Sequence, residues 1–359
     1  MNIGLIIYGS LDTLSGGYLY DRKLVEYLRA QGDTVEIISL PWRNYAAHLT
    51  DNFHFRLPSN LDILIQDELN HPSLIAANQG KHPYPIVSLV HHLRWSELRP
   101  KWQNSFYRFV ERKYLQSVDG VIFNSKTTKQ AVGDLLHSGS DPSTPFIVAY
   151  PPTDRFGKAI SEREIRETIK SSELRILFLG NVIYRKGLHT LLDALSRVGR
   201  DNISSYKLDV VGGLAAEPNY ARKMQAKVEV SGLKSKVAFH GALDKTPLAE
   251  KFKQAHVLVV PSSYEGFGIV YLEGMCFGLP AIGTTAGAAG EIITHGEDGY
   301  LIEPDDAKTL TKYLNELATN RELLLRLCLN AVKRYKSQPK WEETAKSIRT
   351  FLQGMVEAY

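Results

Sequence analysis

Two glutamates, Glu265 and Glu273, lie eight residues apart, and a Gly-Phe-Gly turn follows the first of them. The apolar run at 256–263 predicts a strand that delivers Glu265 to a loop at its carboxyl end. The stretch 268–277 has the spacing of a buried helix, which places Glu273 about two turns into it. Eight helical residues cover about 12 Å, so the two carboxylates can hold opposite ends of an extended, hydroxyl-rich ligand. Free backbone N–H groups at the helix start suit a diphosphate between them. The alternative is a solvated loop charge and a helix-surface charge.

A pair of cations lies after another predicted strand. Arg185 and Lys186 are in the loop that follows 175–180, just before a helix that opens at Gly187. A Lys and an Arg beside a pyrophosphate neutralise its charge and stabilise the charge that develops as it leaves. A solvated basic turn is the alternative for this pair in isolation.

The N-terminal half contributes further polar groups at the ends of predicted strands. Gly16 and Gly17 lie between the first strand and a helix, where paired glycines let a backbone approach an anion or another domain. Histidine at such a strand end can hydrogen-bond a sugar hydroxyl or carry a proton near neutral pH. The residues that we expect to open on one cleft from this half are Asp67, Glu68, His91, His92 and Trp95.

Metal and disulfide chemistry find little support in the residue spacing. A metal site built from His91, His92, His71 and Asp67 is conceivable, but no ligand spacing demands it, and we expect no metal. The two cysteines lie in segments with helical spacing, so a disulfide framework is not expected. A reducing compartment fits this cysteine use best.

Composition is that of an ordinary globular protein of 359 residues with 43% apolar residues, enough for two domains. Lys plus Arg exceed Asp plus Glu by only 43 to 39, which does not indicate nucleic acid as a partner. The N-terminal segment lacks a basic stretch and runs into a turn, so we expect a first strand and not a signal peptide. No apolar run approaches the ~20 residues of a membrane span, and we expect a cytoplasmic protein.

Short apolar runs alternate with helical patterns along the chain, which favours βαβ units and parallel sheets. The joint between two series of strands is expected at 150–173, which has two prolines and a polar stretch. We expect an N-terminal domain at 1–155, a C-terminal domain at 156–338, and a final helix at 339–359 that packs back on the first domain. The predicted strands are 3–8, 35–40, 62–66, 85–90, 120–124, 146–150, 175–180, 207–213, 236–241 and 256–261.

An amphipathic segment at 99–116 carries aromatic residues near one helical face and cations elsewhere. The aromatic residues are Trp102, Phe106 and Phe109, beside Val110. Such a stripe is either a core face with solvated cations opposite, or a surface that lies on the anionic inner face of a membrane.

The order of these motifs is specific. The early glycines, His91, Lys186 and the glutamate pair are followed by TTAGAAGEII and GEDGYLIEPDD. Together they closely resemble the retaining family-4 glycosyltransferases of the GT-B fold, over nearly the whole chain and most strongly from Leu174 to Leu317. The resemblance implies an α/β protein with two doubly wound, Rossmann-like domains facing across a cleft, and a C-terminal helix that crosses back.

The resemblance also implies a role for each matching residue. Glu265 would contact the hydroxyls of the transferred sugar, Glu273 the ribose, and His91 would lie near the reacting carbon. Lys186, helped by Arg185, would hold the diphosphate. The loop around His240 and Gly241 would border the base. The remaining donor contacts would be Gly16, Gly17, Asn181, Gly266, Phe267, Gly268, Ile269 and Val270.

The chain departs from the family pattern in three places. Asn181 stands where the family usually has Arg, so Arg185 would have to complete the diphosphate clamp. The usual Asn-Gly-Val-Asp before the second domain is Pro151–Asp154 here, and the two usual glycines after the acidic pair are Gly287 and Ala288.

We therefore expect a metal-independent, retaining glycosyltransferase that needs no cofactor. It would move a hexosyl group from a nucleotide diphosphate sugar to the hydroxyl of a sugar, a lipid-linked sugar or a small molecule. Asp67, Glu68, His92 and Trp95 are the candidate acceptor contacts. The alternatives are a catalytically silent sugar-nucleotide-binding or scaffold protein, and a GT-B-like epimerase or phosphorylase.

Overall fold

The chain forms two compact units in a computed structural model that describes residues 1–13, 15–97, 99–136, 144–152, 154–198 and 205–359. The first unit is Met1–Pro152 with Pro339–Tyr359, and the second is Thr153–Gln338. The second unit therefore starts at 153, where the sequence led us to expect 156. Arg155 belongs to the second unit because its guanidinium pairs with Glu273 there.

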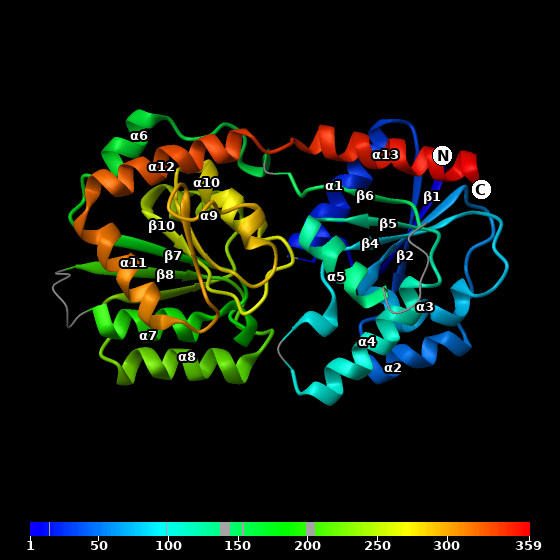
Figure 1. The fold of residues 1–359 in the computed structure, drawn as a ribbon, viewed down its shortest axis with the longest axis horizontal. Helices are drawn as coiled ribbons and strands as arrows, with labels where there is room; N and C mark the ends of the chain where they lie inside the picture. Colours follow the sequence, from blue (N-terminus) through cyan, green and yellow to red (C-terminus); the bar gives the residue numbers. More distant parts are fainter. Residues whose placement is uncertain (14, 98, 137–143, 153, 199–204) are drawn as a thin grey trace. The chain divides into compact units, whose positions relative to one another are not determined.

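The first unit is a parallel sheet with the strand order β2-β1-β3-β4-β5-β6 (Figure 1). Its strands are β1 (Asn2–Tyr8), β2 (Thr34–Leu40), β3 (Ile63–Asp67), β4 (Ile86–Val90), β5 (Gly120–Phe123) and β6 (Phe146–Val148). Its helices are α1 (Gly16–Ala30), α2 (Tyr45–Leu49), α3 (His71–Asn78), α4 (Lys101–Leu115), α5 (Lys126–Leu136) and α13 (Trp341–Ala358).

Both faces of this sheet are covered, and β1 shows how the sequence arranges this. Ile3, Leu5 and Ile7 point to a core that includes residues of α1 and α13. Ile6 and Tyr8 point to the opposite core, with residues of α3, α4 and α5. A strand buried on both sides needs a continuous apolar run, and β1 has one.

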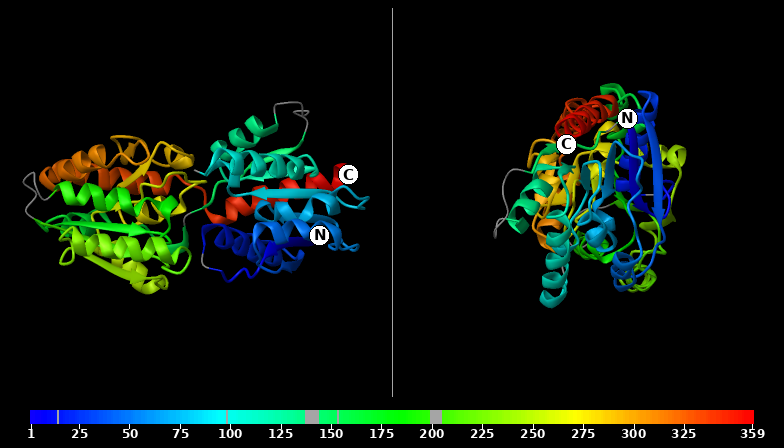
Figure 2. Two further views of the ribbon diagram at one scale, coloured as in Figure 1. Left: turned by 90° about the horizontal axis from the view of Figure 1, so that it is seen from below. Right: turned by 90° about the vertical axis from the view of Figure 1, so that its right-hand side faces the viewer.

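The C-terminal helix α13 completes the first unit. The helix α13 runs beside α1 (Figures 1 and 2). Ile348, Leu352 and Met355 pack in the same core as residues of α1. Arg349 Nε donates to Asp33 Oδ2 at 2.6 Å, and the N-terminal amine of Met1 lies 2.8 Å from Asp33 Oδ1. One buried carboxylate therefore ties both ends of the chain to this unit.

The second unit is another parallel sheet, with the strand order β12-β11-β10-β7-β8-β9. Its strands are β7 (Leu174–Leu179), β8 (Tyr206–Val211), β9 (Val237–Gly241), β10 (Val257–Val259), β11 (Ala281–Thr284) and β12 (Gly299–Ile302). Its helices are α6 (Glu162–Thr168), α7 (Leu188–Val198), α8 (Pro218–Val230), α9 (Lys245–Gln254), α10 (Ile269–Cys276), α11 (Ala307–Thr319) and α12 (Arg321–Lys336).

All ten predicted strands are present as β1 to β10, whereas β11 and β12 were not predicted. The polar joint at 150–173 also contains a helix, α6. Ser161 and Glu164 form a capping box at its start, in which each side chain bonds the other residue's backbone N–H.

Each sheet has one switch point at which the strand order reverses. In the first unit the chain runs from β1 to β2 and returns to place β3 on the other side of β1. In the second unit it runs from β7 out to β9 and returns to place β10 beside β7. Ligands of open α/β sheets bind at the carboxyl ends of the strands at such points.

The helix α4 presents aromatic residues to solvent. The exposed fractions are 71% for Trp102, 44% for Phe106 and 60% for Phe109, whereas Val110 is 4% exposed. The aromatic stripe is therefore not a core face. Within the described ranges, no helix is both long and apolar enough to cross a bilayer.

Candidate functional site

Lys186 and Glu265 meet at the switch point of the second unit, in the loops after β7 and β10. Lys186 Nζ donates to Glu265 Oε2 at 2.6 Å, and Ser262 Oγ donates to the same oxygen at 3.0 Å. Arg185 Nη1 lies 3.9 Å from Glu265 Oε1 and donates to the Tyr264 carbonyl at 2.8 Å. The structure thus brings together the carboxylate and both cations that the sequence singled out.

The charge partners keep Glu265 ionised although its side chain is only 11% exposed. Burial by itself raises the pKa of Glu265, but Lys186, Arg185 and the Ser262 hydroxyl together hold that pKa at about 2. An ionised carboxylate accepts hydrogen bonds from hydroxyl groups. The two cations beside it are placed for a second, anionic part of a ligand.

Two glycines allow the loops around this pair to pack closely. Gly187 has φ +71°, and a Cβ there would lie 2.0 Å from the carbonyl oxygen of Pro261. Gly287 has φ +85°, and a Cβ there would lie 2.1 Å from the carbonyl oxygen of Glu265. The same oxygen accepts the N–H of Ala288 at 2.8 Å. Any side chain at these positions would displace the backbone that carries Lys186 or Glu265.

The start of α10 follows the Gly-Phe-Gly turn that the sequence singled out. Its N-cap is Gly268, with φ +95° and no side-chain cap. Glu273 lies on the same helix, is 2% exposed and accepts a hydrogen bond from Arg155 Nη1 at 2.8 Å on Oε1. Burial raises the pKa of Glu273 although Arg155 opposes this. The described residues give Oε2 no hydrogen-bond partner.

Asn181 does not replace the arginine that is usual in the family. Its side chain is exposed, and its Oδ1 accepts the N–H of Gly213 at 3.2 Å. It therefore links the loops after β7 and β8, and Arg185 is the second cation near Glu265. His240, at the predicted border of the base, pairs with Asp209.

A second group of polar residues lies at the switch point of the first unit. Ser15 caps α1 by accepting the N–H of Tyr18 at 3.3 Å. A Cβ at Gly17 would lie 3.4 Å from the His91 ring, so the glycine and the imidazole are in contact. His91 Nε2 lies 2.9 Å from Oδ1 of Asp21, which is 0% exposed.

Asp67 completes this group at the end of β3. Ligand atoms of Asp21, Asp67 and His91 all lie within 4.8 Å of one another. Burial, together with the nearby Asp21 carboxylate, raises the pKa of Asp67 to about 7. Burial alone would lower the pKa of His91, but Asp21, Asp67 and Glu68 together outweigh burial and raise that pKa. The absence of a bound metal remains a prediction for this group.

The other predicted acceptor contacts are placed differently. Glu68 is 2% exposed, and its carboxylate lies in a buried cluster with His71 and Glu111, which gives no support to an acceptor contact. His92 Nε2 lies 3.0 Å from Glu97 Oε1. The Arg108 guanidinium lies over the Trp95 ring, with its central carbon 5.0 Å from the ring centroid.

Sequence reasoning missed two charged residues of these groups, Asp21 and Arg155. Asp21 lies on the buried side of α1 among Tyr20, Leu24 and Leu28, and a charge in an otherwise apolar helical stripe was the available signal. Arg155 lies in the polar joint, where nothing in the local sequence indicates a partner 118 residues away.

Comparison with known proteins identifies the family. The model of the glycosyl transferases group 1 matches residues 161–334. An uncharacterized glycosyltransferase of Methanocaldococcus jannaschii is 30% identical over 270 residues, which cover 73% of this chain and 67% of that protein. A GDP-mannose-dependent alpha-(1-6)-phosphatidylinositol monomannoside mannosyltransferase of Mycobacterium tuberculosis is 25% identical over 74% of this chain and 68% of that protein. Across the first three curated relatives, the match spans 54 to 67% of their length.

Solved structures with the same fold cover the whole chain. Sucrose-phosphate synthase from Thermosynechococcus elongatus aligns with a TM-score of 0.79 at 20% identity, over 100% of both chains. The Anabaena protein HepE in complex with UDP-glucose aligns with a TM-score of 0.75 at 18% identity, over 99% of this chain and 100% of that one. These likenesses confirm the GT-B fold that the motifs predicted. With this fold and the matched sequence relatives, the chain belongs to the glycosyl transferases group 1 family.

Proposed function

We propose that the protein is a metal-independent, retaining glycosyltransferase that moves a hexosyl group from a nucleotide diphosphate sugar to an acceptor hydroxyl. The observation that carries the proposal is the Lys186–Glu265 pair, 2.6 Å apart at the switch point of the second unit. It offers an ionised carboxylate for sugar hydroxyls beside two cations for a diphosphate. The amides at the start of α10 add donors for the same anion.

In the proposed mechanism the acceptor attacks from the face that the nucleotide leaves. The bond between the anomeric carbon and the diphosphate oxygen breaks, and the departing phosphate oxygen takes the proton of the acceptor hydroxyl. Lys186 and Arg185 stabilise the charge that develops on the diphosphate. No protein nucleophile is required, so Glu265 orients the sugar and does not attack it.

The relatives support the class of donor. HepE has been captured with UDP-glucose, and the mycobacterial relative is named as GDP-mannose-dependent. The rival proposals are a silent nucleotide-sugar-binding or scaffold protein, and an epimerase or phosphorylase. Asn181 in place of the usual arginine keeps the silent protein open, whereas the intact Lys186–Glu265 pair favours catalysis.

We also propose that the protein works in the cytoplasm, with α4 against the anionic inner face of a membrane. Trp102, Phe106 and Phe109 are exposed on this helix. Its cations are Lys101, Arg108, Arg112 and Lys113, and its one acidic residue, Glu111, is buried. An exposed helical surface with aromatic and basic residues and no acid suits an interface with anionic lipid.

Thermal unfolding with a panel of UDP-, GDP- and ADP-linked sugars, in EDTA, tests the donor site. We expect one base to stabilise the protein, and Lys186→Ala to lose most of that shift. The anomer first released by slow donor hydrolysis, followed by ¹H NMR, tests retention. An inverted first product would contradict the stereochemistry, and no shift with any donor would favour the silent scaffold protein.

Co-sedimentation with vesicles tests the membrane contact. We expect binding to phosphatidylcholine vesicles that contain phosphatidylglycerol and little binding to phosphatidylcholine alone. The triple variant Trp102→Ser, Phe106→Ser, Phe109→Ser should lose binding. Val230→Ser is the matched control, because Val230 is an 85% exposed apolar residue on a helix of the second unit. Equal binding by both variants would reject α4 as the contact.

A further inference from the structure

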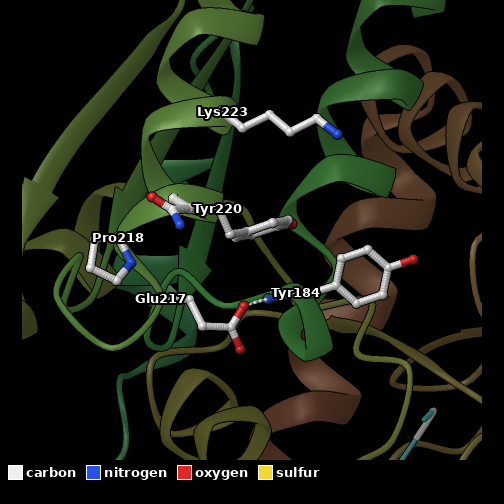
Figure 3. Close-up of a pocket in the computed structure, with 6 residues that line it drawn as sticks. Tyr184, Glu217, Pro218, Tyr220 and Lys223 are labelled. Atoms are coloured by element: carbon white, nitrogen blue, oxygen red, sulfur yellow. Dashed lines mark hydrogen bonds between the residues drawn. The ribbon is translucent and has the colours of Figure 1, made fainter. Parts of the chain in front are cut away.

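An open pocket of about 450 Å³ lies between the loop after β7 and the start of α8. Both elements belong to the second unit, at the carboxyl ends of β7 and β8. None of the predicted donor contacts lines it. Its lining residues are Tyr184, Glu217, Pro218, Asn219, Tyr220 and Lys223 (Figure 3).

The aromatic part of the lining is held in place from behind. The Tyr184 ring stacks on His189, with 4.7 Å between centroids and 14° between planes. His189 is itself fixed, because its Nδ1 lies 2.7 Å from the Tyr220 hydroxyl and its Nε2 lies 3.0 Å from Asp305 Oδ1. Tyr184 remains 50% exposed, so much of a rigidly supported ring is available to a ligand.

A hydrogen-bond acceptor and several hydrogen-bond donors lie beside the Tyr184 ring. Glu217 precedes α8 but does not cap it, since its Oε2 accepts the N–H of Tyr184 at 2.9 Å. The part of the chain that the structure describes gives Glu217 Oε1 no hydrogen-bond partner. The first turn of α8 has no side-chain cap, and Pro218 at its start has no N–H, so the amides that can donate to a ligand are those of Asn219 and Tyr220. Lys223 reaches over the pocket from the next turn of α8 (Figure 3).

We propose that this pocket is a subsite for one pyranose unit of the acceptor glycan. The C–H groups on one face of a pyranose carry partial positive charge and pack on the negative face of an aromatic ring such as Tyr184. Sugar hydroxyls both donate and accept, so they can donate to Glu217 and accept from the α8 amides and Lys223. A pyranose therefore needs an aromatic face, a hydrogen-bond acceptor and hydrogen-bond donors. The lining offers the aromatic ring of Tyr184, one carboxylate and several N–H groups.

The position of the pocket relates it to the transfer reaction. Tyr184 directly precedes Arg185 and Lys186 in the chain, and all three form one short helical turn, Tyr184–Lys186. A sugar bound on Tyr184 would therefore lie beside the proposed diphosphate clamp without occupying it. Calling this sugar part of the acceptor rests on the proposed function, whereas glycoside binding at the pocket does not.

Saturation-transfer difference NMR on the full chain, without a nucleotide, tests the subsite. The probes are the methyl α-D-pyranosides of glucose, galactose and mannose, each compared with uridine and guanosine. We expect at least one glycoside to give signals from its ring C–H protons. Tyr184→Ala should weaken that binding about tenfold or more, and Tyr184→Phe should retain it because the ring face remains.

Lys186→Ala is the matched control, because it should remove the nucleotide shift and leave glycoside binding intact. Four results would overturn the proposal: no glycoside signal, signals unaffected in a folded Tyr184→Ala variant, displacement of the glycoside by UDP or GDP, or signals from a nucleoside in place of the glycosides. Glycoside binding by the unmodified chain without binding of any nucleotide or nucleotide sugar would instead contradict the proposed function alone.

Discussion

The switch points of the two units share a topology and differ in how they handle buried charge. In the second unit, two cations and a hydroxyl hold the pKa of Glu265 at about 2. In the first unit, Asp67 faces Asp21 with one imidazole between them, and its pKa rises to about 7. A parallel sheet positions side chains at one edge, but the neighbouring charges decide what those side chains can do. The second unit is prepared for an anion, and the first for the binding or release of a proton.

The largest effect should come from removing the lysine of the second unit. We expect Lys186→Ala to lower the rate of transfer about 100- to 1,000-fold, or about 2.7–4 kcal/mol, because the leaving diphosphate loses a buried cation. Lys186→Arg should recover part of this loss. Single-turnover kinetics with the donor identified by the thermal panel measures it. A loss of less than about tenfold in the transfer rate would show that this cation contributes little to transfer. The contrast between the two switch points would then fail.

The buried acids of the first unit should make its stability fall as pH rises. Burial raises the pKa values of Glu68 and Glu111 to about 8, from the ordinary glutamate value of 4.5. Between pH 5 and 8 the unfolded chain releases protons that the folded unit keeps, so the free energy of unfolding decreases over this range. For one shared proton these pKa values correspond to a decrease of about 3–4 kcal/mol between pH 5 and 8.

Hydrogen exchange at pH 5 and pH 8, corrected for the intrinsic rates, can separate the units. Peptides of the first unit should lose protection at pH 8, and Glu68→Gln should reduce that loss. Glu265 contributes in the opposite sense, because a lowered pKa gives stability above the unfolded value that is lost only as pH falls toward 2. Equal losses of protection in both units would show that the two units do not differ in how pH affects their stability.

Asp21 should act on catalysis through His91. In Asp21→Asn the carboxylate that raises the pKa of His91 is gone, so that pKa should fall. We expect a decrease of about tenfold in kcat, with a shifted pH profile and little change in nucleotide binding. NMR titration of the His91 ring proton measures the pKa directly. An unchanged pKa, or a defect confined to folding, would show that Asp21 does not position the imidazole.

The fold was accessible from sequence because its pattern is repeated and local. Strands such as β1 and β4 are continuous apolar runs, which doubly covered parallel strands require. The strands β11 and β12 escaped although other strands as short were predicted. Glycine interrupts the apolar run AIGT of β11, and the GYLI of β12 was interpreted only as part of the GEDGYLIEPDD motif. The exposure of the aromatic residues on α4 could not be predicted either, because a helical stripe shows which residues share a face but not whether another element covers that face.

The site was accessible only in part. Lys186 and Glu265 follow adjacent strands in a recognisable order of motifs, which predicted one common site for them, but their direct ion pair at 2.6 Å was not predicted. The burial of Glu68 was not, because a carboxylate at a strand end has the same sequence whether it faces solvent or the Glu111 side chain. Asp21 required the tertiary contact between α1 and the end of β4, and no single segment contains that information.

The packing of α13 bears on how the protein is made. The second unit is one continuous stretch, so its sheet can form before α13 is synthesised. The first unit begins earlier in the chain, yet Ile348 and Leu352 of its core follow the whole second unit. Its core therefore stays incomplete until α13 has left the ribosome, so the unit that begins first is the later of the two to complete its core.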